Sequence, residues 1–64
     1  MKTLIVIRSI IIAMSDNDFG AIAAAEEDYW DTDRRVSRNG RKRMIYHLSK
    51  YDLTLDDWWR WANL

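Results

Sequence analysis

The sequence predicts a small α+β domain in which an N-terminal β-strand is followed by about three helices. Residues 3–14 are rich in Ile and Val, whose branched side chains suit a pleated strand. Residues 41–51 and 55–63 instead place their large apolar side chains at helical spacing. At 64 residues the chain is too short for two domains, so we expect residues 1–64 to form a single unit.

The expected strand carries apolar side chains on both of its faces. One face holds Leu4, Val6, Arg8, Ile10 and Ile12, and the other holds Ile5, Ile7, Ser9 and Ile11. A strand of this kind needs cover on both sides or a partner chain. We therefore expect a homodimer in which two copies pair through residues 3–13.

A first helix is expected from about residue 16. Ser15 can cap it, and Asp18 follows three residues later, where acidic side chains favour a helix start. Ala-rich residues 21–27 continue the helix.

Asn39-Gly40 permits two interpretations. As a tight turn it would join strands 34–38 and 41–48 into a hairpin and give a β-α-β-β-α order. As a helix end it would let a second helix span residues 41–51. We favour the helix, because the hairpin would place Arg38 directly opposite Arg41.

The last helix has the clearest local signal. Thr54 is placed to cap it and Asp57 to bond back to the cap, while Leu53 and Trp58 can form a hydrophobic staple. This helix should run from about Leu55 to the end of the chain.

Composition argues against an enzyme. The chain has no Cys, a single histidine (His47) and two glycines, so it lacks a thiol nucleophile, a Cys-type zinc site and a glycine-rich phosphate loop. No serine lies in a nucleophile-elbow context. We therefore expect no catalytic residues, no cofactor and no metal.

Two short resemblances do not change that expectation. Residues 15–26 resemble an EF-hand loop, with Gly20 at the turn and Glu26 last, but Ser15 and Phe19 replace two ligands. Residues 48–58 are similar to the helical segment that precedes the metal-binding part of phage endonuclease VII-type nucleases. That segment has none of the family's zinc cysteines or its catalytic histidine, so the resemblance implies a reused helical pair without nuclease activity.

Charge is strongly segregated although the total is zero. Residues 1–33 hold seven acidic and two basic side chains, whereas residues 34–50, the basic segment, hold seven basic side chains and no acid. The basic segment could bind a nucleic-acid backbone, with aromatic residues stacking on bases. Alternatively, its cations pair internally with the acids of residues 16–33.

These observations favour a non-enzymatic protein that acts by contact with a larger host protein or complex. A nucleic-acid-binding regulator that uses the basic segment is the alternative. Tiny aromatic-rich chains without catalytic residues look like phage or mobile-element inhibitors of host defence or nucleic-acid-handling machinery. The apolar run 4–14 is shorter than the roughly 20 residues of a membrane span, so we expect a cytoplasmic protein without membrane contact. The expected partner contacts are Arg34, Arg35, Arg38, Arg41, Lys42, Arg43, Trp59 and Trp61.

Overall fold

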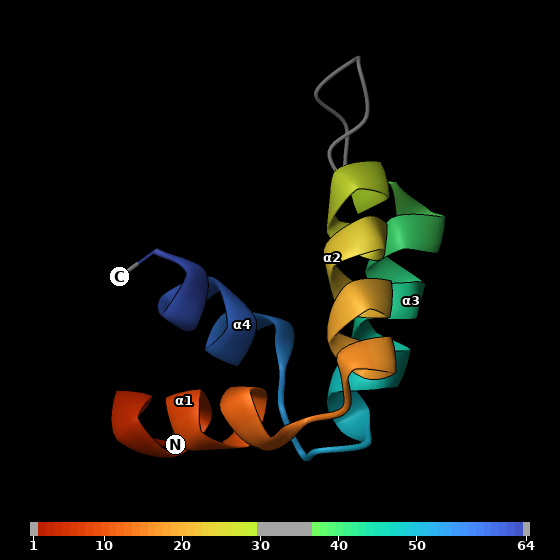
Figure 1. Ribbon diagram of the computed structural model, residues 1–64. Helices are drawn as coiled ribbons and strands as arrows, with labels where there is room; N and C mark the ends of the chain where they lie inside the picture. The colour runs from red at the N-terminus through yellow and green to blue at the C-terminus, as the bar shows by residue number, and fades with distance from the viewer. Residues whose placement is uncertain (1, 30–36, 64) are drawn as a thin grey trace.

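The computed structural model describes residues 2–29 and 37–63, which form four helices (Figure 1). These are α1 (Leu4–Ala13), α2 (Asp16–Tyr29), α3 (Arg38–Ser49) and α4 (Leu55–Ala62). No strand occurs in these two ranges, so the predicted α+β fold and its β-α-β-β-α alternative are both wrong. The described part of the chain is a small, all-helical, bundle-like domain.

The helices pack as two antiparallel pairs (Figure 1). α2 and α3 lie side by side, whereas α4 runs back along α1, and the two pairs point in different directions. Side chains from all four helices and their connections meet in one apolar cluster. It contains Ile7, Ile11, Met14, Ile22, Ala25, Met44, Leu48, Leu53 and Trp58.

The N-terminal segment is a helix rather than the expected strand. The Thr3 side chain caps it by accepting a hydrogen bond from the Val6 amide at 3.3 Å. Ile7, Ile11 and Met14 recur at the spacing of one helical face, and all three are buried against the other helices. Strand propensity is weak against such packing. The strand pairing through residues 3–13 is therefore also wrong, and the homodimer itself stays a prediction.

The helix expected over residues 41–51 is confirmed, but it begins earlier. Ser37 is the N-cap and accepts from the Gly40 amide at 3.3 Å, so Asn39 and Gly40 lie inside the first turn of α3. Both interpretations of Asn39-Gly40 as a chain break are wrong. Gly40 is buried against the backbone of α2, a close approach that a residue without a Cβ permits.

The predicted capping box of the last helix is confirmed. Thr54 Oγ1 accepts from the Asp57 amide at 3.2 Å, and Asp57 Oδ2 accepts from the Thr54 amide at 3.0 Å. Just before it, Asp52 adopts a left-handed conformation with φ of 57°, which Asp tolerates better than most residues. This reversal turns the chain from α3 into α4 and so lays α4 along α1.

Candidate functional site

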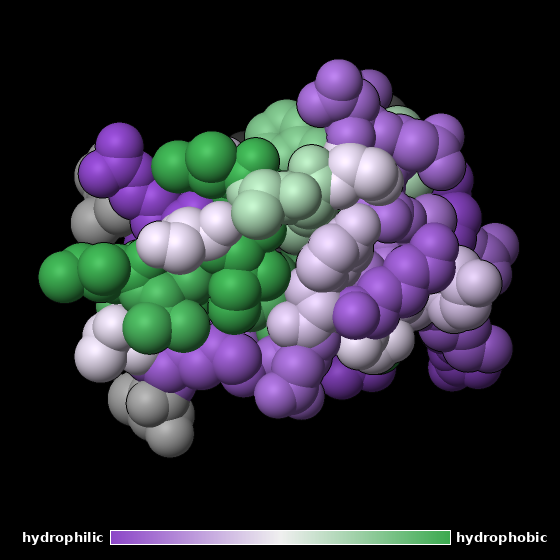
Figure 2. Space-filling model, turned by 60° about the horizontal axis from the view of Figure 1, so that its bottom comes forward, coloured by the Kyte–Doolittle hydropathy of each residue, from purple (hydrophilic) through white to green (hydrophobic). Residues whose placement is uncertain are grey.

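The most exposed apolar surface of the described chain lies on α1. Its outward side carries Ile5, Val6 and Ile12, which are 79%, 45% and 68% exposed. We call these three residues, with Ser9 between them, the outer face of α1. Figure 2 shows strongly apolar side chains gathered on the side of the molecule where α1 comes forward. Contiguous exposed apolar surface of this kind marks an interaction site in proteins that are otherwise well packed.

Two polar side chains, Arg8 and Ser9, lie between the exposed isoleucines of the outer face of α1. Ile5 and Ile12 are two helical turns apart, and Ser9 lies between them. The Ser9 hydroxyl donates to the Ile5 carbonyl oxygen at 2.9 Å, so it already has a partner within its own helix. Covering this face would therefore leave no orphaned hydroxyl. Arg8 lies three residues after Ile5 and four before Ile12, on the same side of the helix, and is exposed.

The described cations of the basic segment divide into two groups. Arg43 forms an ion pair with Asp28, and Lys50 forms one with Asp18, so part of the expected internal pairing with residues 16–33 exists. Arg38, Arg41 and Lys42 are exposed, and no ion pair joins them to another residue within 2–29 or 37–63. Arg34 and Arg35 lie outside the described residues.

A groove between α3 and the start of α4 adjoins Arg41, one of these exposed cations. Its volume is about 370 Å³, and Ile45, which is partly exposed, contributes to its apolar lining. The lining residues are Arg41, Ile45, Leu53, Thr54, Leu55 and Asp56. The groove thus places a cation and an exposed isoleucine side by side.

Both tryptophans expected as partner contacts pack at the edge of the core. The Trp59 ring lies 5.3 Å from the Tyr29 ring, measured between centroids. The Trp61 ring lies 5.1 Å from that of Trp58 and meets Phe19 edge-on at 6.0 Å. Both tryptophans are half-buried, so each retains some surface for a partner while contributing to the fold.

A cluster centred on the buried Asp18 ties the start of α2 to the end of α3. Its carboxylate accepts from the Tyr51 hydroxyl at 2.6 Å, from His47 Nδ1 at 2.8 Å, from Ser15 Oγ at 2.9 Å and from Lys50 Nζ at 3.0 Å. The hydrogen bond from Tyr51, followed by those from His47, Lys50 and Ser15, holds the pKa of Asp18 far below its usual range. The same Asp18 contact raises the pKa of Lys50.

This cluster does not have the geometry of a hydrolase. Ser15 Oγ donates to the Asp18 carboxylate and also accepts from the Asp18 amide at 3.1 Å. The Ser15 hydroxyl therefore acts as the predicted helix cap and bonds to Asp18, whereas a hydrolase would need it to bond to His47. The sequence predicts Asp18 only as an acidic residue at a helix start, and its burial with four hydrogen-bond donors is a finding of the structure. The available signal was the spacing of His47, Lys50 and Tyr51, which puts three polar side chains on one helical side.

We expect Asp18→Asn to lower stability at neutral pH and to make the acid dependence of stability shallower. Because the folded state depresses the pKa of Asp18 below its ordinary value of 3.8, its contribution is present above that value. The contribution is lost as the pH falls below about 4, toward the folded-state pKa. Urea unfolding between pH 2 and pH 7 measures this effect. Asp16→Asn, at an exposed position in the same turn, should keep the wild-type acid dependence.

The described residues contain neither a group of metal-ligating side chains nor a membrane-spanning helix. Within 2–29 and 37–63, no group of three or more His, Cys, Asp or Glu side chains is placed to hold a metal ion. Residues 16–26 are helical, so they do not form an EF-hand loop. None of the helices in these ranges is long and apolar enough to cross a bilayer.

Comparison of the chain with models of protein families, with curated proteins and with solved structures finds no match.

Proposed function

We propose that this chain is a non-enzymatic binding protein that acts by protein–protein contact, with the outer face of α1 seated in an apolar groove of a larger protein. The observation that carries the proposal is the exposure of Ile5 and Ile12 on a helix whose only polar side chains are Arg8 and Ser9. A helix of this kind is ordinarily covered on every side. Moving these side chains out of water favours association.

The dimensions of α1 favour a larger partner over a second copy. With 10 residues, α1 is roughly 15 Å long. Two such helices crossing each other would cover little more than Ile5 and Ile12, whereas a stable interface buries about 800 Å² on each partner. A groove would also cover Val6 and Arg8. A chain that fills such a groove blocks it, which is how a phage or mobile-element inhibitor of host machinery would act.

The test is photo-crosslinking from the centre of the outer face of α1. A benzophenone side chain in place of Ser9 should couple to one protein in the cell that produces the chain, at residues lining an apolar groove. The double variant Ile5→Gln, Ile12→Gln should reduce this product at least about tenfold, because it removes the two apolar anchors. Its matched control is Ile45→Gln, an exposed isoleucine on α3, which should leave the product unchanged.

Two results would contradict this proposal. A product that joins two copies of the chain would identify the homodimer as the occupant of the face. A product that persists in the double variant would show that Ile5 and Ile12 do not hold the partner. Circular dichroism should show the helix content of the wild type in both variants, since the substituted side chains are exposed.

A nucleic-acid-binding regulator is the second candidate, because Arg38, Arg41 and Lys42 are exposed without ion pairs in the described part of the chain. Binding through three cations should weaken with salt, with a log–log slope of about −3 for duplex DNA. Arg38→Gln should reduce that slope by about one. Fluorescence anisotropy with duplex and single-stranded DNA measures both. No binding at 50 mM salt would remove this candidate.

A further inference from the structure

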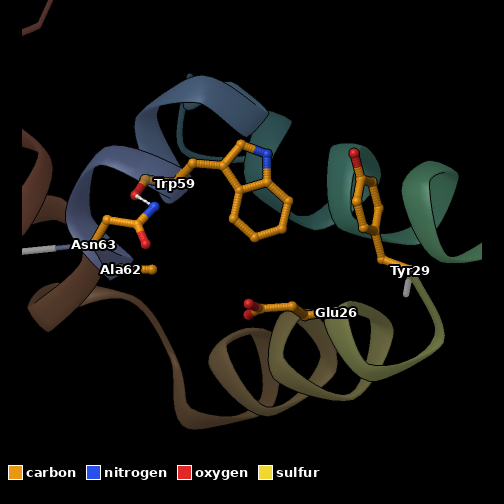
Figure 3. Close-up of a pocket in the computed structure, with 5 residues that line it drawn as sticks. All are labelled: Glu26, Tyr29, Trp59, Ala62 and Asn63. Atoms are coloured by element: carbon orange, nitrogen blue, oxygen red, sulfur yellow. Dashed lines mark hydrogen bonds between the residues drawn. The ribbon is translucent and has the colours of Figure 1, made fainter. Parts of the chain in front are cut away.

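A pocket of about 400 Å³ separates α2 from α4, away from the outer face of α1 (Figure 3). Two of its lining residues, Glu26 and Tyr29, belong to α2, and the others belong to α4 or its C-terminal cap. Among the described residues, the lining is formed by Glu26, Tyr29, Trp59, Ala62 and Asn63. We call this space the α2–α4 pocket. Its volume lies within the usual range for small-molecule sites, about 300–1,000 Å³.

Two aromatic rings form the walls of the α2–α4 pocket. The Tyr29 and Trp59 ring centroids are 5.3 Å apart, and their planes are inclined by 59°. In Figure 3 the Trp59 indole extends from α4 above Glu26, and Tyr29 stands to one side of it. The faces of aromatic rings are electronegative and attract cations within about 6 Å, most strongly at Trp.

The carboxylate of Glu26 stands beside these rings. Glu26 is half-buried, and its Oε2 accepts a hydrogen bond from Trp58 Nε1 at 3.0 Å, which fixes the carboxylate at the pocket. No cation within residues 2–29 and 37–63 forms an ion pair with it. A negative charge that is partly removed from water favours a positive ligand.

Asn63 completes the rim with a neutral acceptor. Its side-chain nitrogen donates to the Trp59 carbonyl oxygen at 2.8 Å, which holds the amide against the end of α4. The amide oxygen is left as an acceptor. None of the lining residues that the structure describes is cationic, and together they offer one carboxylate, two aromatic rings and one amide.

We propose that the α2–α4 pocket binds an alkylammonium cation. The carboxylate supplies the opposing charge, and the Tyr29 and Trp59 rings supply faces for the N-alkyl groups, the arrangement used to recognise quaternary ammonium groups. The ligand is either a free amine or the methylated lysine side chain of a peptide. The proposal does not depend on the role of the outer face of α1.

Titration with choline, at ionic strength held constant with sodium chloride, tests the charge requirement. The indole N–H signals of Trp58 and Trp59 in nitrogen-15 NMR spectra should shift in a saturable manner, with a dissociation constant of about 1 mM. The neutral isostere 3,3-dimethyl-1-butanol should bind roughly tenfold more weakly, because it lacks the charge that Glu26 attracts. Equal binding of the two compounds would overturn the proposal.

Glu26→Gln is the decisive variant, because Gln keeps an acceptor for the Trp58 indole while it removes the charge. We expect it to weaken choline binding about tenfold. Glu27→Gln makes the same charge change at an exposed neighbour and should bind like the wild type. Equal weakening in both variants would indicate diffuse charge attraction and would overturn the site.

Trp59→Leu separates the aromatic contribution from the charge. It keeps an apolar side chain and should abolish measurable choline binding while helix content persists by circular dichroism. Undiminished binding in this variant would contradict the proposed aromatic wall. A trimethyl-lysine peptide then distinguishes the ligand sources: tighter binding than choline points to a protein partner, and equal binding points to a free amine.

Discussion

Replacing Gly40 by alanine is expected to lower the free energy of unfolding by about 3 kcal/mol, because it overpacks the contact between α2 and α3. A Cβ at this position would lie 2.6 Å from the Tyr29 nitrogen, 2.9 Å from the Ala25 oxygen and 2.9 Å from the Asp28 carbonyl carbon. All three are backbone atoms of α2, so no side chain can swing aside. The two helices would have to separate.

Such a loss is large for a domain of this size. A core of 64 residues without disulfides supplies about 3–5 kcal/mol, so much of the Gly40→Ala protein should be unfolded at 25 °C. Urea unfolding followed by far-ultraviolet circular dichroism measures the change. The matched control is Gly20→Ala in α2, where a Cβ would meet nothing within 4 Å. It should gain about 0.5–1 kcal/mol from helix propensity. Wild-type stability for Gly40→Ala would contradict the close approach of the two helices.

Trp58→Ala should lower the free energy of unfolding by about 3–5 kcal/mol, because it removes the largest buried side chain of α4 and leaves a cavity. Trp58 is 2% exposed, and its ring lies 5.7 Å from Phe19 and 5.1 Å from Trp61. Its indole nitrogen also donates to Glu26 on α2. The substitution therefore removes the main side chain that holds α4 on α2, together with a cross-helix hydrogen bond.

Trp61→Ala provides the comparison for Trp58→Ala, because Trp61 is half-buried at the margin of the same aromatic group. We expect Trp61→Ala to lower the free energy of unfolding by about half as much, because the Trp61 side chain buries a smaller area than Trp58 does. Because the whole domain has about 3–5 kcal/mol of stability, Trp58→Ala should be largely unfolded in buffer by circular dichroism, whereas Trp61→Ala should keep a guanidinium transition monitored by the fluorescence of the remaining tryptophans. An equal loss of stability in the two variants would show that the whole aromatic face of α4, rather than Trp58 in particular, holds the helix in place.

The helix starts at Ser15 and Thr54 could be predicted from the sequence because their chemistry is local. A cap joins a side chain to a backbone amide three residues away, so both partners lie in one short stretch of sequence. The apolar face of α3, with Met44 and Leu48 four residues apart, is local in the same sense.

The conformation of residues 4–13 could not be decided in this way. Ile-rich sequences suit a strand and a buried helix, and the choice depends on what covers them. Here α4 packs along the segment, and Ile7 and Ile11 enter the common core. Asn39-Gly40 has a strong turn signal, but the need for a residue without a side chain against α2 outweighs it.

The sequence by itself determined where α2 and α4 begin, which segment is basic and that no cysteine is present to supply a thiol. Tertiary structure decided that Arg43 and Lys50 are paired, whereas Arg38, Arg41 and Lys42 form no ion pair with the residues that the structure describes. It also brought Glu26 and Trp59 together from separate helices into one pocket. The physical reason is range: capping and helix periodicity act within one or two turns, whereas pairing and pocket formation depend on contacts between residues far apart in the chain.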